Sequence, residues 1–245
     1  GLLVDSKTIT FVWTDPSTKS NPAVAKNILM FGDSFTQAGI MTRELYNYLV
    51  TQKAWSNYKF IGQKTNTEGV RHQGMGGYAI HDFIIPPDQM RPTFNSNPFY
   101  NPTTQKLDFK YYMSNNSFAG DIDYLILEHG VNDMLTYSRT PDQIVADLKT
   151  FIDQLHVDYP NCKVLLCGLV PLSPINDMYS AYLHNNKILD TNKAYDDFAA
   201  GSSYSSFVTY VPVSAEFNVD YAYDYEMKPA YKNSTEQVKV LKDWL

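Results

Sequence analysis

The 245-residue chain has few cysteines, little charge and no long hydrophobic run. Its two cysteines are too few for the disulfide scaffold of a small secreted domain. Charged residues make up 19% of the chain, and 26 acidic against 20 basic side chains give a formal net charge of −6. A net-negative chain without a cluster of Lys and Arg lacks the electrostatic footprint of proteins that bind nucleic acid or anionic membranes. We therefore expect neither nucleic acid nor a membrane as a partner.

The apolar runs, of which residues 164–170 are an example, fall far below the roughly 20 residues needed to cross a bilayer. The chain does not open with a signal-peptide pattern, because Asp5 interrupts it after four residues. A soluble chain of this length fits a single α/β domain with a large core. The spacing of Cys162 and Cys167 sends their side chains to opposite faces of a strand, so we expect two core thiols.

Apolar and amphipathic segments alternate along the chain, which indicates an α/β fold. The clearest helical pattern covers residues 141–156, where one apolar stripe runs along the segment before Pro160 closes it. Alternating strands and helices predict a three-layer α/β/α sandwich around a central parallel sheet of about five strands. The expected strands are residues 27–31, 58–62, 124–127, 164–169 and 207–213, and a more polar helix is expected at 176–200.

The domain is expected to span residues 27–245, with residues 1–26 as an N-terminal extension or an edge strand. Residues 84–121 form a long insertion rich in Pro, Asn and aromatic residues. Loops of this length in compact domains are often functional. We expect this one to wall one side of a pocket.

Three unusual polar clusters fall at or just beyond the expected strand ends: Gly32-Asp33-Ser34, Gly74-Met75-Gly76-Gly77 and Gly130-Val131-Asn132-Asp133. In open parallel sheets, ligands bind outside the carboxyl ends of the strands. The three clusters are therefore the expected site.

Ser34 follows a buried strand and precedes a segment with helical spacing of apolar residues. At such a turn a serine lies near a helix N-terminus, where free N–H groups favour developing negative charge, and this placement suits a nucleophile. A plain helix cap or turn is the alternative, since Asp and Ser favour both. The turn lacks the second glycine of the G-x-S-x-G elbow and lacks a phosphate-binding G-x-x-x-x-G-K-[ST] loop, which places a flavodoxin-like cofactor binder last.

Two further residues could donate hydrogen bonds next to Ser34. Gly77 offers a backbone N–H with no side chain to block approach, and Asn132 offers a side-chain amide. Together with the Ser34 N–H, they make three donors that could stabilise one oxyanion.

These clusters resemble the sequence blocks of the SGNH, or GDSL-type, hydrolases. Block one is similar to residues 31–39, block two to residues 74–77, and block three, Gly-x-Asn-Asp, to residues 130–133. The resemblance implies the flavodoxin-like fold of this family, a nucleophilic serine at Ser34, and an oxyanion hole from Ser34, Gly77 and Asn132. Within these blocks, Asp33 and Asp133 are expected to support the site.

The family's fourth block is Asp-x-x-His, in which the histidine is the general base and the aspartate orients it. The sequence ends Lys242-Asp243-Trp244-Leu245, so the resemblance assigns the orienting role to Asp243 and places the histidine one residue after Leu245. A solvated terminal aspartate is the alternative interpretation.

Five histidines lie within the chain. His129 and His81 are the candidates for a substitute base, although His129 at a buried strand end is more typical of a packed core residue. His72 flanks block two, and His156 and His184 are expected on helix surfaces. Their spacing does not match a zinc site, so we expect neither a metal nor a cofactor.

The resemblance thus implies a serine esterase that hydrolyses acyl esters. The polar, tyrosine-rich composition favours O-acetyl groups on carbohydrates as the substrate. The alternative is a carbohydrate-binding or virion-associated module of the same fold that has lost catalysis, because the base histidine does not occur in the 245 residues.

Overall fold

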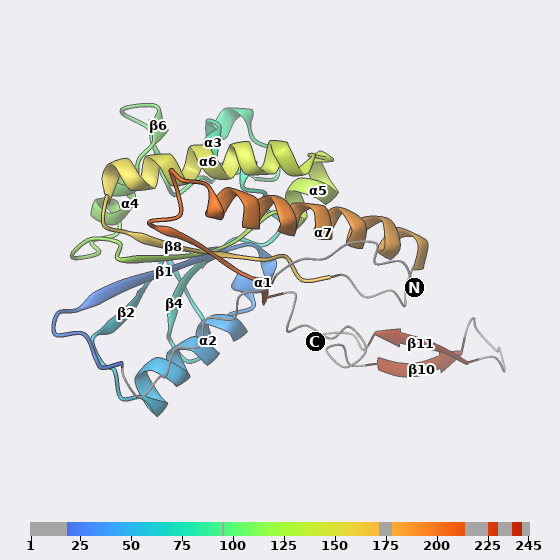
Figure 1. Ribbon diagram of the computed structural model, residues 1–245, viewed down its shortest axis with the longest axis horizontal. Coiled ribbons are helices and arrows are strands. Elements are labelled where there is room, and N and C mark those ends of the chain that lie inside the picture. Colours follow the sequence, from blue (N-terminus) through green and yellow to red (C-terminus); the bar gives the residue numbers. More distant parts are fainter. Residues whose placement is uncertain (1–18, 95, 172–177, 214–224, 230–236, 242–245) are drawn as a thin grey trace.

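Figure 1 shows a computed structural model of the chain, which describes residues 19–94, 96–171, 178–213, 225–229 and 237–241. Asp243 and most of the N-terminal extension lie outside these residues. The domain is a three-layer α/β/α sandwich, as the sequence predicts, with helices on both faces of one central sheet (Figure 1).

The central sheet has seven strands in the order β3-β4-β1-β7-β8-β9, and β2 also pairs with β1. All five predicted strands are confirmed. The strands of this sheet are β1 (Lys26–Gly32), β2 (Tyr58–Ile61), β3 (Lys64–Thr65), β4 (Arg71–Gly74), β7 (Tyr124–Glu128), β8 (Lys163–Cys167) and β9 (Val208–Val211).

The sheet is parallel except at one edge. β1 pairs in parallel with β7 on one side, and with β2 and then β4 on the other, while β3 runs antiparallel to β4. The sequence does not predict β3 and β4, because both are polar segments without an apolar run. β4 contains Gly74, so block two begins inside the sheet.

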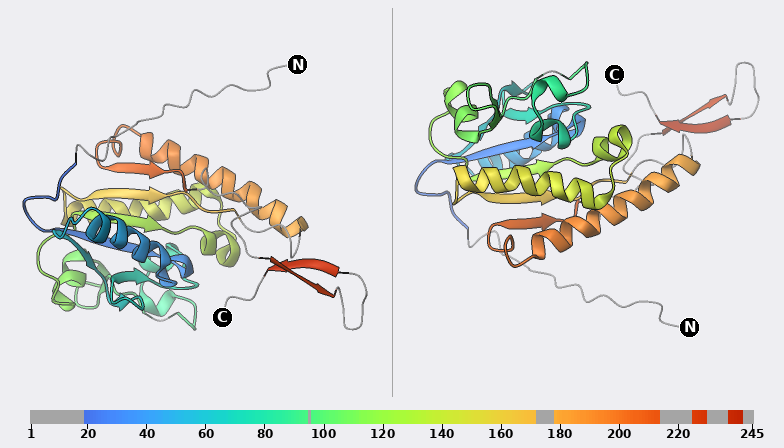
Figure 2. Two further views of the ribbon diagram at one scale, coloured as in Figure 1. Left: turned by 90° about the horizontal axis from the view of Figure 1, so that it is seen from below. Right: turned by 90° about the horizontal axis from the view of Figure 1, so that it is seen from above.

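The helices form the two outer layers. α2 (Ile40–Tyr46) continues into the π-helix η2 (Asn47–Gln52), and the apolar side chains of this segment cover one face of β1. α6 (Pro141–Asp158) and α7 (Met178–Ala200) pack side by side over the other face (Figure 2). The shorter helices are α1 (Ser34–Gln37), α3 (His81–Ile84), the 3₁₀ helix η3 (Pro87–Gln89), α4 (Phe109–Asn115) and α5 (Val131–Tyr137).

Helix α6 begins and packs as its sequence predicts. The Thr140 side chain accepts a hydrogen bond from the Gln143 N–H, and the Gln143 side chain accepts one from the Thr140 N–H, forming a capping box ahead of the first turn. Its predicted apolar stripe is fully buried: Ile144, Leu148, Phe151, Ile152 and Leu155.

The insertion between α3 and β7 contributes to the core more than expected. Its β5–β6 hairpin (Tyr100–Asn101 and Lys106–Leu107) and helix α4 fold back against α6. Phe99, Phe109 and Tyr112 are fully buried in the main hydrophobic core. Other insertion residues line a groove of about 450 Å³ against α6, and that groove contains no residue of the three blocks.

Cys162 and Cys167 are both buried free thiols and belong to different core clusters, as their spacing predicts. Residues 225–229 (β10) and 237–241 (β11) pair as an antiparallel hairpin. In the described part of the chain, no helix has both the length and the apolar character needed to span a membrane.

Phe151 at the centre of α6 is expected to be essential for stability. Its ring centroid lies 5.1 Å from that of Phe31 and 4.9 Å from that of Phe109, so Phe151→Ala opens a cavity between the sheet and the insertion. We expect the free energy of unfolding to fall by about 3–5 kcal/mol. The matched control is Val157→Ala, because Val157 lies on the same helix with 72% of its surface exposed. Denaturant unfolding of both variants is the measurement, and equal losses would contradict this account of the core.

Candidate active site

The three polar blocks meet at the carboxyl end of β1. In the sheet register, Gly32 stands opposite Gly74 of β4 on one side and Glu128 of β7 on the other. Two backbone hydrogen bonds extend this pairing beyond the strands, from Met75 N to Gly32 O at 2.8 Å and from Asp33 N to Glu128 O at 3.2 Å. The sheet itself therefore brings the three blocks together.

Ser34 is the first residue of α1, directly after the end of β1, and it is exposed. Asp33 is the N-cap of this helix, and its carboxylate accepts a hydrogen bond from the Phe35 N–H at 3.0 Å. The predicted strand, tight turn and helix are thus confirmed. Ser34 is thus exposed at the start of a helix, just beyond the carboxyl end of β1.

Block two packs against the first helix through glycines. A Cβ on Gly74 would lie 2.2 Å from the Gln37 backbone nitrogen, so only glycine permits this approach. The Gln37 side chain in turn accepts a hydrogen bond from the Gly76 N–H at 2.6 Å. These contacts fix the loop that carries Gly77 relative to the helix that carries Ser34.

Gly77 has a φ of +81°, in the left-handed region that favours glycine. The Phe94 ring closes the space where a Cβ would stand, at 3.0 Å. Arg91 lies over that ring at 3.8 Å and donates a hydrogen bond to the Gly77 carbonyl at 2.7 Å. Two residues of the insertion, Arg91 and Phe94, therefore pack against Gly77 and help to fix the position of block two.

Asn132 connects all three blocks through one side chain. Its amide nitrogen, Nδ2, donates to Asp33 Oδ2 at 3.0 Å and to the Tyr78 carbonyl at 3.1 Å. Asp33 belongs to block one and Tyr78 directly follows block two. Ser34, Gly77 and Asn132, the three residues predicted to act together, thus lie on segments that contact one another.

Asp133, the last residue of block three, is fully buried. Its two carboxylate oxygens accept hydrogen bonds from Ile80 N at 2.9 Å and from His81 N at 3.2 Å. Burial raises the pKa of Asp133 to about 6, and the two backbone donors oppose that rise. The carboxylate ties the start of α5 to the chain that follows block two.

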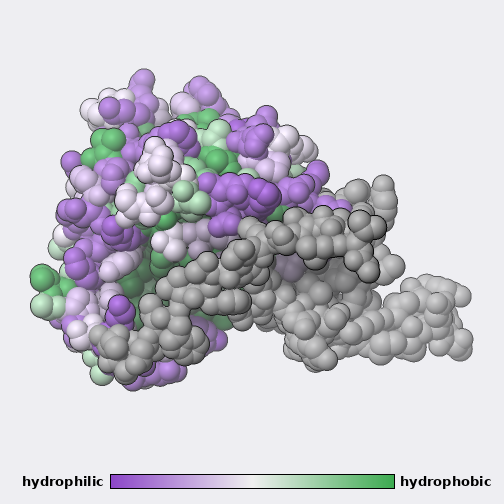
Figure 3. All heavy atoms as spheres, in the orientation of Figure 1, coloured by the Kyte–Doolittle hydropathy of each residue, from purple (hydrophilic) through white to green (hydrophobic). Residues whose placement is uncertain are grey.

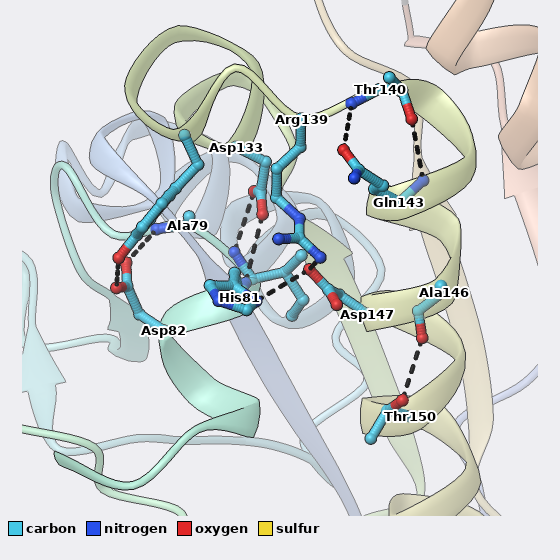
Figure 4. Close-up of polar contacts among 12 residues, drawn as sticks. Ala79, His81, Asp82, Asp133, Arg139, Thr140, Gln143, Ala146, Asp147 and Thr150 are labelled. Atoms are coloured by element: carbon cyan, nitrogen blue, oxygen red, sulfur yellow. Dashed lines mark hydrogen bonds and ion pairs between the residues drawn. The ribbon is translucent and has the colours of Figure 1, made fainter. Parts of the chain in front are cut away.

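Sequence reasoning did not find the polar network around this loop (Figure 4). His81 and Arg139 both point at Asp147 of α6. His81 Nδ1 lies 3.2 Å from Asp147 Oδ2, and Arg139 Nη2 lies 2.7 Å from the same oxygen. Asp82 is fully buried and accepts hydrogen bonds from Arg91 at 2.9 Å, from Ala79 N at 2.8 Å and from the Tyr137 hydroxyl. His81 and Asp147, and Tyr137 and Asp82, lie far apart in the sequence, so a local pattern could not reveal that these segments meet.

His81 contacts Asp147, as described, and its ring is partly exposed. His129 is fully buried between Phe31 and Phe83, and burial lowers its pKa to about 3. It is a neutral core residue that cannot serve as a base on the surface.

The remaining histidines are His72, His156 and His184. His72 is buried, and its Nδ1 accepts a hydrogen bond from the Gly74 N–H at 3.1 Å. His156 is not a surface residue as expected, because its ring stacks on Phe207 at 4.0 Å. His184 lies on α7. Among the residues that the structure describes, no group of three or more His, Cys, Asp or Glu is placed to hold a metal ion.

The family model of the GDSL-like lipase/acylhydrolases matches residues 30–230, which include all three blocks. The chain belongs to this family. It is therefore an acylhydrolase of the SGNH type, a carboxylic ester hydrolase, and the resemblance seen in the three blocks is confirmed. A comparison with curated proteins found no match.

Solved structures of esterases share the fold. An acetyl esterase with a Ser-to-Ala substitution and bound acetate is 14% identical, with a TM-score of 0.56 over 80% of this chain and 84% of that one. A carbohydrate esterase of family 3 from Talaromyces cellulolyticus is 15% identical, with a TM-score of 0.50 over 76% of this chain and 77% of that one. At these identities the likeness shows the fold.

The Asp133 carboxylate makes a testable contribution to stability. The pKa of Asp133 is about 6 in the folded chain and near 3.8 in the unfolded chain, so folding takes up a proton at pH values between these two pKa values. Stability from this group is therefore present below about pH 4 and is lost as the pH rises through about 6. In Asp133→Asn we expect that pH dependence, on the order of 2–3 kcal/mol, to disappear. Denaturant unfolding from pH 4 to 7 measures it, and parallel curves for variant and parent would contradict it.

Proposed function

We propose that the chain is a serine esterase in which Ser34 is the nucleophile. The observation that carries this proposal is the junction at the end of β1, where Asn132 bonds both to Asp33, the neighbour of Ser34, and to Tyr78, the neighbour of Gly77. These bonds support a site that combines the Ser34 hydroxyl, two backbone N–H groups and the Asn132 amide. That set suits acyl transfer.

In the proposed reaction, the Ser34 oxygen attacks the ester carbonyl and forms a tetrahedral intermediate. Its oxyanion accepts hydrogen bonds from the N–H groups of Ser34 and Gly77 and from the Asn132 amide. The Ser34 N–H lies at the start of α1, where it interacts with the Asp33 carboxylate, and in the proposed reaction the oxyanion replaces that carboxylate as its acceptor. Collapse of the intermediate expels the alcohol and leaves an acyl group on Ser34, which water then removes.

Asn132 cannot serve the oxyanion without a change of partners. Both protons of its amide nitrogen are used, one by Asp33 and one by the Tyr78 carbonyl. An oxyanion that accepts from Asn132 must therefore replace one of these two acceptors. Exchange at Tyr78 keeps the bond to the helix that carries Ser34, and we propose that the exchange occurs there.

The resemblance assigns the base of the proposed reaction to the histidine of the family's Asp-x-x-His block, in which Asp243 is the aspartate. Its imidazole takes the proton of the Ser34 hydroxyl and passes it to the leaving alcohol, while the Asp243 carboxylate holds the ring in the correct tautomer. Asp243 lies outside the described residues. Experiments on activity should therefore use the full-length polypeptide.

We propose O-acetyl esters of carbohydrates as the substrate class. Hydrophilic residues spread over the face seen in Figure 3, with smaller apolar patches between them, and such a surface suits a polar glycan. Phe35, directly after Ser34, is 39% exposed and offers a face on which a sugar ring can stack. The fold shared with an acetyl esterase and a carbohydrate esterase is consistent with this choice.

Replacement of the nucleophile tests the reaction. Ser34→Ala should lower hydrolysis of p-nitrophenyl acetate and of acetylated oligosaccharides to the residual rate that binding and the oxyanion donors provide, a loss of at least about 10³-fold. The control, Ser205→Ala, changes an exposed serine beyond α7 and should leave the rate unchanged. A parent chain that binds acetylated glycans without hydrolysing them would instead support the binding-module alternative.

Replacement of Asn132 tests the oxyanion hole. Asn132→Ala removes one donor, so kcat should fall by about 10²- to 10³-fold while KM changes little. Asn132→Asp should be equally impaired, because a carboxylate repels the oxyanion and Asp33 alike. Thermal unfolding separates this loss from misfolding. Equal kcat values for Asn132→Ala and the parent would rule out the assigned role.

A further inference from the structure

Two acidic side chains lie together beneath Ser34, and the proposed reaction uses neither directly. Asp33 is 1% exposed and Glu128, the last residue of β7, is 6% exposed. Gly32 makes room for them, because a Cβ there would lie 2.7 Å from Glu128 Oε2 and 2.0 Å from Thr36 Oγ1. The missing side chain lets the Glu128 carboxyl reach across the end of β1.

The two carboxyl groups have unequal sets of donors. Asp33 accepts from the Phe35 N–H and from Asn132 Nδ2, and both the N–H and the hydroxyl of Ser34 lower its pKa further. Glu128 accepts from the Thr36 hydroxyl at 3.2 Å. The Glu128 and Asp33 carboxyl groups lie close enough that each shifts the pKa of the other. Neither carboxyl forms an ion pair with a basic side chain within the described ranges.

Electrostatics decides which carboxyl carries a proton. Burial, and next the negative charge of Asp33, raise the pKa of Glu128 well above its usual range. Burial also raises the pKa of Asp33, but its backbone donors and the hydrogen bond from Glu128 oppose the rise. Two buried carboxylates in contact cannot both ionise at moderate cost. The proton therefore belongs on the side with fewer donors, which is Glu128.

The other titratable groups near Glu128 are neutral at physiological pH. Cys167 on β8 and Tyr195 on α7 both interact with the Glu128 charge, and burial raises the pKa of each. The Tyr195 hydroxyl donates to the His129 carbonyl at 2.7 Å, and the His129 ring itself is neutral. The pair therefore carries a single negative charge, on Asp33.

We propose that Glu128 is a positioning residue that stays protonated and donates a hydrogen bond to Asp33, holding the carboxylate that orients Asn132 and caps the helix of Ser34. The catalytic consequence rests on the proposed function. The protonation of Glu128 does not rest on the proposed function, because it follows from the burial and contacts of the two carboxyl groups.

Two substitutions separate the hydrogen bond from the packing. Glu128→Gln keeps a donor toward Asp33, whereas Glu128→Met keeps the approximate volume and removes the donor. We expect kcat of the full-length enzyme at pH 7 to fall about tenfold or more in Glu128→Met with little change in KM. Glu128→Gln should restore most of that loss. Equal kcat values for the two variants would overturn the proposal, because a purely structural role does not distinguish them.

The pH profile provides a second readout. In the parent, kcat should decline at alkaline pH when Glu128 ionises and repels Asp33. Glu128→Gln should lack this decline, since its amide does not titrate, while Cys167 and Tyr195 are common to both proteins. A decline that persists unchanged in Glu128→Gln would assign it to another group and overturn the proposal.

Infrared spectroscopy tests protonation independently of activity. At pH 8, above the pKa of about 6 of Asp133, the parent should show the C=O stretch of a protonated carboxylic acid. This band should be absent from Glu128→Gln and present in Glu44→Gln, which changes an exposed glutamate. A parent without the band would overturn the proposal even if the esterase is active. A parent with the band but no esterase activity would refute the proposed function and leave the protonated pair standing.

Discussion

The parallel register at the end of β1 is the constraint on which the site depends. Gly32 stands opposite Gly74 and Glu128, so the three strands that precede the blocks all end at one level of the sheet. A side chain at either glycine would collide with its neighbours: with Thr36 and Glu128 at position 32, and with the Gln37 backbone at position 74. The close approach of strand, loop and helix is therefore possible only without side chains. The nucleophile and its proposed donors are held by backbone packing rather than by flexible contacts.

Four acidic side chains are buried around this junction. Asp33, Asp82, Asp133 and Glu128 are all nearly inaccessible to solvent. Burial of a carboxyl is costly unless hydrogen bonds or a proton compensate it, and each of these groups is compensated differently. Asp82 has Arg91, Asp133 has two backbone N–H groups, and Asp33 has Asn132 and Glu128. The bonds of Asp33 and Asp133 join segments distant in sequence, so together they fix the loops that the sheet alone leaves free.

The sequence predicts the parts of this structure that depend on local patterns. The five parallel strands and α6 are recognisable because apolar runs and an apolar helical stripe are local features, and the three blocks because each motif is short. β4 is missed because its residues, Arg71–Gly74, are polar and show no apolar alternation. Glu128 is missed because it directly follows an apolar run and its partners, Asp33 and Thr36, lie about 90 residues away in the sequence, at the start of α1. Residues of the insertion, which was expected to wall a pocket, line a groove against α6 that contains no residue of the three blocks. Its rings Phe99 and Phe109 are buried in the core, and burial of such rings is worth about 1.5–3 kcal/mol each.

Asn132 shows how the junction and the buried pair work together. Its amide is saturated by Asp33 and by the Tyr78 carbonyl, so it can stabilise an oxyanion only by giving up one partner. The two partners are not equivalent. Asp33 carries the negative charge of the carboxyl pair and is held by further donors, so its bond to Asn132 is charge-assisted and strong. The Tyr78 carbonyl is neutral and lies on the loop beside Gly77. The weaker bond is thus the one that an oxyanion replaces, and the stronger one keeps the amide in place while it does so. On this account Glu128 acts by making the two bonds of Asn132 unequal.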